Sequence, residues 1–121
     1  MEQAGTTKFI FLVLFLLLLD NGHGSCVASE VQVQQYKVRD IPPGDSEYIV
    51  KVINPGACLQ TDIVLSCDDF NSLEPLDTSV IDVDGEHIYI KKNISDYSSV
   101  NFKYSWPHQE TITPSSSKQC C

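Results

Sequence analysis

The five cysteines constrain this chain more than any other feature of its sequence. They all follow residue 25, and the last two end the chain: Cys26, Cys58, Cys67, Cys120 and Cys121. Cys58 and Cys67 are nine positions apart, at the two ends of one apolar segment. Because an extended chain rises by about 3.3 Å per residue, their sulfur atoms lie too far apart to bond to each other. Each of the two therefore needs a different partner or stays free.

The first 24 residues form a leader that is typical of an exported protein. Lys8 precedes eleven consecutive apolar residues, 9–19, and a polar, glycine-containing segment follows them. Eleven residues suit the core of a signal peptide and are fewer than the ~20 that a membrane-spanning helix needs. We therefore expect cleavage near Gly24, a secreted single domain over residues 25–121, and no membrane insertion after cleavage. An uncleaved membrane anchor is the alternative, and the short run and its single flanking cation argue against it.

The part that remains after cleavage is acidic. Loss of Glu2, Asp20 and Lys8 leaves 14 acidic and 7 basic side chains, a net charge of −7. Carboxyl groups with ordinary pKa values of about 4 stay ionised even in a mildly acidic extracellular fluid. Such a surface is repelled by nucleic acid, by anionic lipid and by polyanionic wall polymers. We therefore expect no nucleic-acid partner and favour a neutral or basic protein face.

Export also determines how the cysteines are interpreted. An oxidising compartment favours disulfides, and a domain of this size gains stability from them. Joining Cys58 to the C-terminal pair would close a loop of roughly sixty residues, worth about 4 kcal/mol in the chain-entropy estimate. A bond between the adjacent Cys120 and Cys121 would be strained, so we expect none. We expect Cys58 and Cys67 to tie the two ends of one strand to different neighbours. Since five is an odd number, one thiol stays free or links a second chain, which leaves a disulfide-linked dimer open.

We find no metal-binding or catalytic motif in the sequence. The cysteines form no Cys-x-x-Cys pair, and His87 and His108 are not at zinc-finger spacing. Residues 82–86 (Asp-Val-Asp-Gly-Glu) are similar to the start of a calcium loop, but its twelfth position is Asn93 instead of glutamate. The chain also lacks a nucleophile elbow, an HExxH pair and glycine-rich phosphate or dinucleotide loops. We therefore expect no metal, no cofactor and no enzymatic activity.

Apolar residues recur with period two along most of the chain after the leader, which predicts β-strands. The segments with this pattern are 31–36, 48–52, 58–66, 80–83, 87–90 and 100–104, with 111–113 as the candidate for a last strand. Turn residues separate them at 41–45 and 54–56, and Asp84-Gly85 is a strong signal for a two-residue hairpin. No window of 11 residues has helical periodicity. The sequence therefore predicts an all-β fold, a small antiparallel β-sandwich stapled by disulfides.

One polar loop carries a modification signal. Asn93-Ile94-Ser95 is an N-glycosylation sequon within residues 91–98, the most polar loop of the chain. In an exported protein we expect Asn93 to carry a glycan. A glycan there would make this loop face solvent, so we do not expect it to form the centre of a protein interface.

Several short blocks occur in an order that matches a known family. The most specific block has two cysteines enclosing eight residues with an Ile-x-Leu strand, followed by Phe-x-Ser. The matching residues are, in chain order, Cys26, Val31, Gln35, 41–44, Tyr48, Val50, Val52, Asn54, Cys58, Ile63, Leu65, Cys67, Phe70, Ser72, Phe102, Tyr104 and Cys120 or Cys121. On these residues the chain resembles the tapetum-determinant family of small secreted plant proteins over nearly all of residues 26–121.

The chain also departs from the family pattern. Asn54 and the segment 81–83 stand where family members usually carry cysteines, and the joint loss is what a lost disulfide would look like. Asp68-Asp69 replaces a Gly-Trp pair, and the final Cys-Cys is unusual for the family. These departures leave the expected fold intact and bear on the choice of partner.

The resemblance implies a function outside the cell. It implies an apoplastic ligand for the extracellular domain of a leucine-rich-repeat receptor kinase, acting in cell-fate specification in reproductive tissue such as the anther. The domain would present an edge strand or end loops to the receptor. Our candidates for receptor contact are Asp68, Asp69, Phe70, Tyr104, Trp106 and His108. Two other functions were considered. One is a structural or wall-associated secreted protein. The other is a membrane-anchored lumenal transferase, against which the length of 97 residues argues.

Overall fold

The computed structural model describes residues 26–121, and every regular element in this range is a β-strand. The expected leader, residues 1–24, and its cleavage site lie outside the described residues. The strands are β2 (Cys26–Ser29), β3 (Gln32–Ile41), β4 (Asp45–Ile53), β5 (Leu59–Ser66), β6 (Ile81–Asp84), β7 (His87–Ile90), β8 (Ser99–Trp106) and β9 (Thr113–Cys120). The all-β class that the sequence predicts is confirmed.

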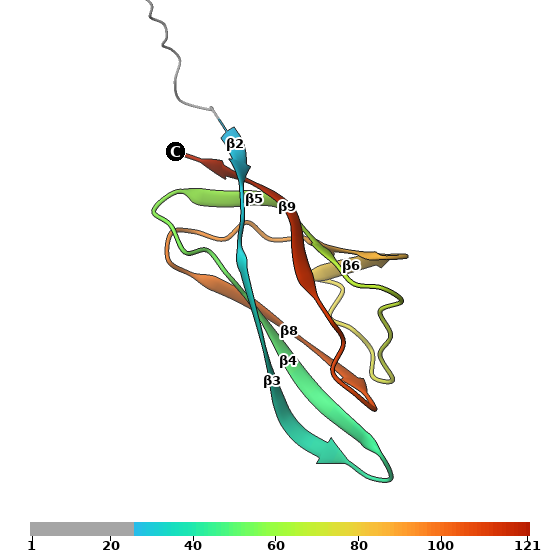
Figure 1. Cartoon of the computed structure of the whole chain (residues 1–121). Coiled ribbons are helices and arrows are strands. Elements are labelled where there is room, and N and C mark those ends of the chain that lie inside the picture. The colour runs from blue at the N-terminus through green and yellow to red at the C-terminus, as the bar shows by residue number, and fades with distance from the viewer. Residues whose placement is uncertain (1–25) are drawn as a thin grey trace, which may run out of the picture.

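The strands form two sheets that face each other (Figure 1). One sheet has five strands in the order β2-β9-β5-β7-β6, and the other has three in the order β3-β4-β8. All neighbouring strands in both sheets are antiparallel. The last strand, β9, therefore lies between β2 and β5. The β3–β4 hairpin extends past the rest of the sandwich, and its turn forms one tip of the molecule (Figure 1).

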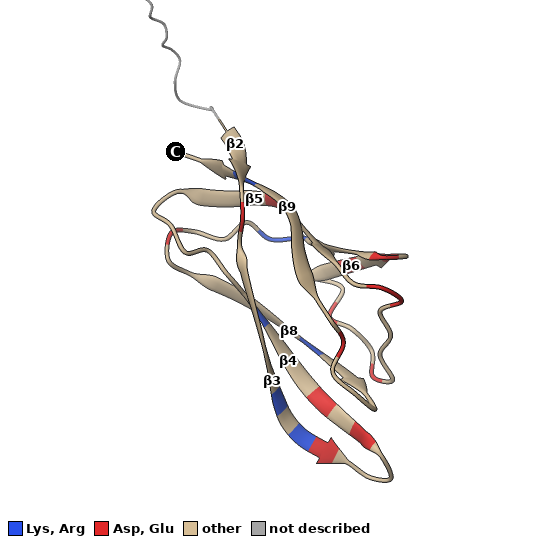
Figure 2. Cartoon of the chain, viewed as in Figure 1, with Lys and Arg blue, Asp and Glu red and all other residues tan. Residues whose placement is uncertain are grey.

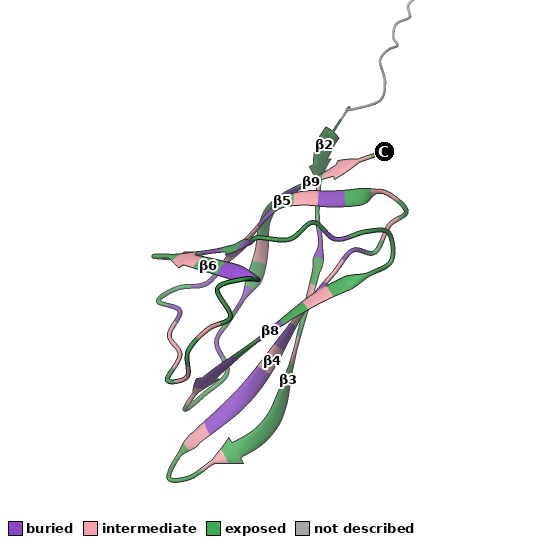
Figure 3. Ribbon diagram, turned by 180° about the vertical axis from the view of Figure 1, so that it is seen from behind, coloured by how far each residue is buried: buried purple, intermediate pink, exposed green. Residues whose placement is uncertain are grey.

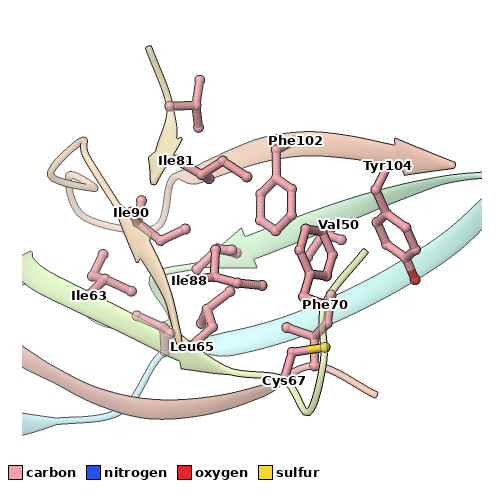
Figure 4. Packing of buried hydrophobic residues seen from close by; sticks show 14 of the residues in the cluster. Val50, Ile63, Leu65, Cys67, Phe70, Ile81, Ile88, Ile90, Phe102 and Tyr104 are labelled. Atoms are coloured by element: carbon pink, nitrogen blue, oxygen red, sulfur yellow. The ribbon is translucent and has the colours of Figure 1, made fainter. Parts of the chain in front are cut away.

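The core lies between the two sheets. Alternate side chains of the five-stranded sheet, such as Ile63, Leu65 and Ile88, point toward Val50 and Phe102 from the other sheet (Figure 4). Within the three-stranded sheet, β4 is the central strand and is largely buried, whereas the edge strand β3 is largely exposed (Figure 3). This pattern follows from period-two alternation, because one face of each strand turns to the core and the other to solvent.

Aromatic rings close one end of the core. The ring of Phe70 meets those of Phe102 and Tyr104 edge-on, with centroids 6.5 and 5.2 Å apart. Tyr48 stacks on Tyr104 at 5.2 Å. Edge-on and offset arrangements of this kind are favoured by the ring quadrupoles, so the cluster contributes more than its buried area alone.

Both disulfides converge on the C terminus. Cys120, at the end of β9, bonds to Cys26 on β2, and Cys121 bonds to Cys58, which immediately precedes β5. The adjacent pair does not bond to itself, as the strain argument predicts. The prediction that Cys67 anchors its end of β5 through a disulfide is wrong. Its side chain is 3 % exposed and points into the core beside Phe70, at the end of β5 away from the C terminus (Figure 4).

The position of Cys67 also bears on the odd number of cysteines. The other four described cysteines are bonded in pairs, so Cys67 is the thiol left over. A buried thiol cannot meet a thiol of a second chain without opening the core. The structure of residues 26–121 therefore gives no support to a disulfide-linked dimer.

Two strands and one turn differ from those predicted. No pattern in the sequence predicted β2, and the last strand, which residues 111–113 were expected to open, runs over Thr113–Cys120. The hairpin expected at Asp84-Gly85 turns one residue later, because Asp84 pairs with His87 and leaves Gly85 and Glu86 in the loop. Gly85 has a φ of 61°, a left-handed conformation that glycine adopts without the usual steric penalty.

Candidate functional site

A hollow of about 410 Å³ lies where the five-stranded sheet ends near β5 and β9. Ser66, the last residue of β5, pairs with Thr113, the first residue of β9. The segment that leaves β5 and the segment that enters β9 therefore run side by side, and the hollow opens between them. Its lining residues are Ser66, Cys67, Asp68, His108, Gln109, Glu110, Thr111 and Thr113. In this way the fold joins two segments that are forty residues apart in sequence.

Glu110 is the most buried carboxylate of this hollow. Its side chain is 9 % exposed, and its Oε2 accepts a hydrogen bond of 3.2 Å from the backbone N–H of Asn71. Its Oε1 lies 3.6 Å from Nε2 of His108, whose side chain is 71 % exposed. The carboxylate is thus held from one side by the backbone and faces an exposed imidazole on the other.

A closed set of hydrogen bonds fixes the backbone of Glu110. Its N–H donates to the hydroxyl of Tyr104 at 2.8 Å, and this hydroxyl donates to Oε1 of Gln35 at 2.5 Å. The side-chain amide of Gln35 then donates to the carbonyl of Glu110 at 2.7 Å. Three segments, β3, β8 and the loop before β9, are therefore locked together at one wall of the hollow.

Two buried groups near this wall stay neutral at physiological pH. Burial raises the pKa of Tyr104 to about 12. Burial also raises the pKa of the Cys67 thiol to about 11, and the carboxylates of Glu110, Asp68 and Asp69 contribute to the same shift. Since the thiolate is the reactive form of cysteine, Cys67 is poorly suited to act as a nucleophile.

The predicted contact residues divide into two groups. Asp68, Asp69 and His108 are exposed, and the structure brings Asp68 and His108 together at the hollow. Phe70 is 8 % and Tyr104 0 % exposed, so these two predicted contact residues offer a partner little surface in this structure. Their rings fill the core between the sheets, which is the default role of aromatic residues in a small domain. Trp106 is intermediate: it is half-buried and packs against the core.

Sequence reasoning missed Glu110. It stands in a polar loop without an apolar pattern, and nothing in the sequence separates it from the other thirteen acidic residues that follow the leader. Its burial arises from the packing of this loop against Asn71, Tyr104 and Gln35, contacts that join residues distant in sequence. We find no local signal that would have identified it.

The basic residues are largely engaged elsewhere. At the projecting β3–β4 hairpin, Lys37 pairs with Asp40 at 2.7 Å and Arg39 with Glu47 at 2.9 Å (Figure 2). The Arg39 guanidinium lowers the pKa of Glu47. No lysine or arginine lines the hollow beside Cys67, so its carboxylates have only the His108 imidazole as a nearby cationic group.

The sequon loop lies at the opposite end of β5 from the hollow. Asn93 is exposed, whereas Ile94 is 1 % exposed and forms a bridge with Gln60. The side-chain amide of the fully buried Asn54 donates to the carbonyls of Cys58, Ile94 and Ser95 at 2.7, 3.0 and 3.1 Å. The loop is therefore fixed to the protein while the Asn93 side chain points outward. Residues 91–98 are exposed except for Ile94, which is buried.

The described residues were also searched for metal-binding groups and for membrane-spanning helices. Residues 26–121 contain no group of three or more His, Cys, Asp or Glu side chains arranged to hold a metal ion. The same range contains no helix of the length and apolarity that a bilayer crossing requires.

Comparison with known proteins identifies the family. A family model described as "Tapetum determinant 1, C-terminal" matches residues 27–121, which include strands β3 to β9 and both members of the Cys58–Cys67 block. No curated protein and no solved structure matches the chain significantly. Because the family model covers more than half of the chain, this protein belongs to the tapetum determinant 1 family.

Proposed function

We propose that this protein is a secreted signalling ligand that binds the extracellular domain of a leucine-rich-repeat receptor kinase and acts in plant cell-fate specification. The observation that carries the proposal is the family match over residues 27–121, because it is consistent with a role in plant developmental signalling. The partner and the reproductive tissue follow from the resemblance to known members. The protein acts by recognition and is not an enzyme.

One feature of the structure and one of the sequence support a role outside the cell. Two disulfides tie a small domain together, which suits an oxidising compartment. In addition, the expected leader would direct the chain into the secretory pathway. We propose that residues 1–24 are removed and that Asn93 carries a glycan. Asn93 is exposed on a fixed loop, which is the situation an acceptor site requires.

The receptor-facing surface then lies away from the glycan. A glycan on Asn93 would obstruct the end of the sandwich near the start of β5, whereas the hollow opens near the end of β5. We therefore propose that the receptor binds the end that carries Asp68, Asp69 and His108. These three exposed side chains remain from the predicted contact set.

A binding experiment with defined receptors tests the function. The full chain is expressed with its leader in plant cells, purified from the medium, and measured against purified ectodomains of leucine-rich-repeat receptor kinases by biolayer interferometry. We expect saturable binding to one ectodomain or to a few related ones, and no binding after the disulfides are reduced. Disulfide-intact protein that binds no member of a complete panel would contradict the proposal.

The glycan and the cleavage site have separate tests on the same material. Amino-terminal sequencing should begin at or close to Ser25. Peptide N-glycosidase should increase the mobility of the wild-type protein on a gel and leave Asn93→Gln unchanged. An intact residue 1, or identical mobility with and without the enzyme, would contradict the respective part of the proposal.

A further inference from the structure

The hollow beside Cys67 contains a carboxylate oxygen that lacks a hydrogen-bond donor. Among the described residues, Oε2 of Glu110 accepts a hydrogen bond from Asn71, whereas Oε1 accepts none. The ring nitrogen Nε2 of His108 lies 3.6 Å from Oε1, beyond ordinary hydrogen-bond distance. A carboxylate that is more than nine-tenths buried needs donors to offset the loss of its hydration. Oε1 is not fully enclosed, since the enclosed side-chain N and O atoms without a partner in the described residues are Oε1 of Gln60 and Oγ of Ser105; it is therefore open to the hollow, where an entering donor can bond to it.

The electrostatic field in the hollow favours a cation. Asp68 lines the hollow next to Glu110, the exposed Asp69 follows it, and no lysine or arginine lies in the lining. The raised pKa of the Cys67 thiol, due first to burial and then to these three carboxylates, is consistent with such a field. Negative charge that disfavours a thiolate stabilises an incoming ammonium or guanidinium group by the same Coulomb interaction.

The carboxylate is also held in place before any ligand arrives. The N–H and the carbonyl of Glu110 are bound by Tyr104 and Gln35, and its Oε2 by Asn71. A group that is already positioned loses little conformational entropy on binding, so more of the interaction energy appears as affinity. By contrast, the side chain of His108 is 71 % exposed.

We propose that this hollow receives a basic side chain, preferably arginine, from the surface of the receptor that the protein binds. A guanidinium group presents several N–H donors in a planar fork that suits carboxylate oxygens such as Oε1 of Glu110, whereas an ammonium group offers a single charged point. The hollow, about 410 Å³, has room for such a side chain. The identity of the partner rests on the function proposed above, but the chemistry of the hollow does not.

A small arginine derivative tests the hollow without a receptor. N-acetyl-arginine methylamide is titrated into ¹⁵N-labelled, disulfide-intact protein, and N-acetyl-glutamine methylamide serves as the uncharged control. We expect saturable shifts of the backbone amide signals of Asp68, Gln109, Glu110 and Thr111 with the arginine derivative alone. Equal shifts with both compounds, or shifts that are absent or spread over the whole protein, would overturn the inference.

Variants test whether the shifts of the amide signals depend on the charge of Glu110. Glu110→Gln keeps an acceptor for the Asn71 N–H and removes the charge, so we expect binding of the arginine derivative to weaken about tenfold or more. Asp96→Asn is the matched control, an exposed carboxylate in the sequon loop at the other end of β5, and should bind like the wild type. If Glu110→Gln does not fold, Thr111→Lys places a competing cation in the lining and should weaken binding in the same way. Wild-type binding by the folded Glu110 variant, or by Thr111→Lys, would overturn the inference.

The receptor assay separates this inference from the proposed function. If the wild-type protein binds an ectodomain and Glu110→Gln binds it at least tenfold more weakly, both stand. If the two proteins bind it equally, the hollow is not the docking point, and the inference fails while the proposed function stands. If the wild type binds no ectodomain, the proposed function fails and the receptor as the source of the basic side chain fails with it, whereas the titration reports separately on the chemistry of the hollow.

Discussion

Cys120 and Cys121 are neighbours in the chain, yet their disulfides lead to opposite sides of β9. Cys120 bonds to Cys26 on β2, and Cys121 bonds to Cys58 at the start of β5. Since β9 lies between β2 and β5 in the sheet, the two bonds tie the end of β9 to both of its neighbours. The strand itself, TPSSSKQC, has little apolar surface to bury, so the covalent links supply stability that its side chains do not.

Removal of the Cys58–Cys121 bond should destabilise the fold strongly. The bond spans a sequence separation of 63 residues. The chain-entropy estimate for a loop of that size is about 4 kcal/mol, so we expect Cys58→Ala/Cys121→Ala to lower the free energy of unfolding by about that amount. Urea unfolding followed by Trp106 fluorescence measures the change. Cys67→Ala, which leaves both disulfides in place, is the control and should lose much less; an equal loss in both variants would contradict this account.

Asn54 should be essential for the loop that carries the sequon. Its fully buried amide donates to three carbonyls, and its Oδ1 accepts from the N–H of Gly56 at 3.0 Å. Asn54→Ala leaves these buried groups without partners, and we expect a loss of about 2–4 kcal/mol in the free energy of unfolding. Asn101→Ala, on the exposed face of β8, is the matched control and should change stability by less than about 0.5 kcal/mol. Similar losses in both would show that the Asn54 network does not stabilise the fold.

The neutral Cys67 thiol predicts a loss of stability at alkaline pH. Its pKa is about 11 in the fold against an ordinary value of 9.0, so the unfolded chain releases this proton first as the pH rises. The stabilisation is complete below pH 9 and is lost as the pH rises toward 11. We expect the free energy of unfolding to fall between pH 9 and pH 11 and to fall less in Cys67→Ala. The variant keeps the contribution of Tyr104, whose pKa shifts in the same direction. Parallel pH profiles for the two proteins would be the contrary result.

The strands that the sequence predicts are those in which apolar side chains alternate within the strand itself. β4, β5 and β7 place buried residues at alternate positions, and the sequence shows this alternation in Val50, Val52, Ile63, Leu65, Ile88 and Ile90. β2 and β9 lack such a pattern because they are held by strand pairing and by disulfides to distant residues. No local rule identifies Ser115 and Ser116 as part of a central strand. Their place depends on the sheet that the rest of the chain builds.

The sequence predicted only part of the candidate site, as it predicted only part of the fold. Asp68 and His108 were selected from sequence, and the fold brings them to one hollow. Glu110 could not be selected, because its burial depends on contacts with β3 and β8. Phe70 and Tyr104 show the converse: their residue types favour a core position, and the structure places both there. For both aromatic side chains the residue type was the better guide to position in the fold.

The most direct test of the account is a disulfide map of protein purified from the medium. Free thiols are blocked at acidic pH under denaturing conditions, and the unreduced protein is digested with trypsin and an Asp-specific protease. Cleavage before Asp62 separates Cys58 from Cys67, and cleavage after Lys118 releases residues 119–121. We predict that residues 119–121 are linked both to the Cys26 peptide and to the Cys58 peptide, while Cys67 alone carries the blocking group. A linked Cys67, or blocking groups on all five cysteines, would contradict the account.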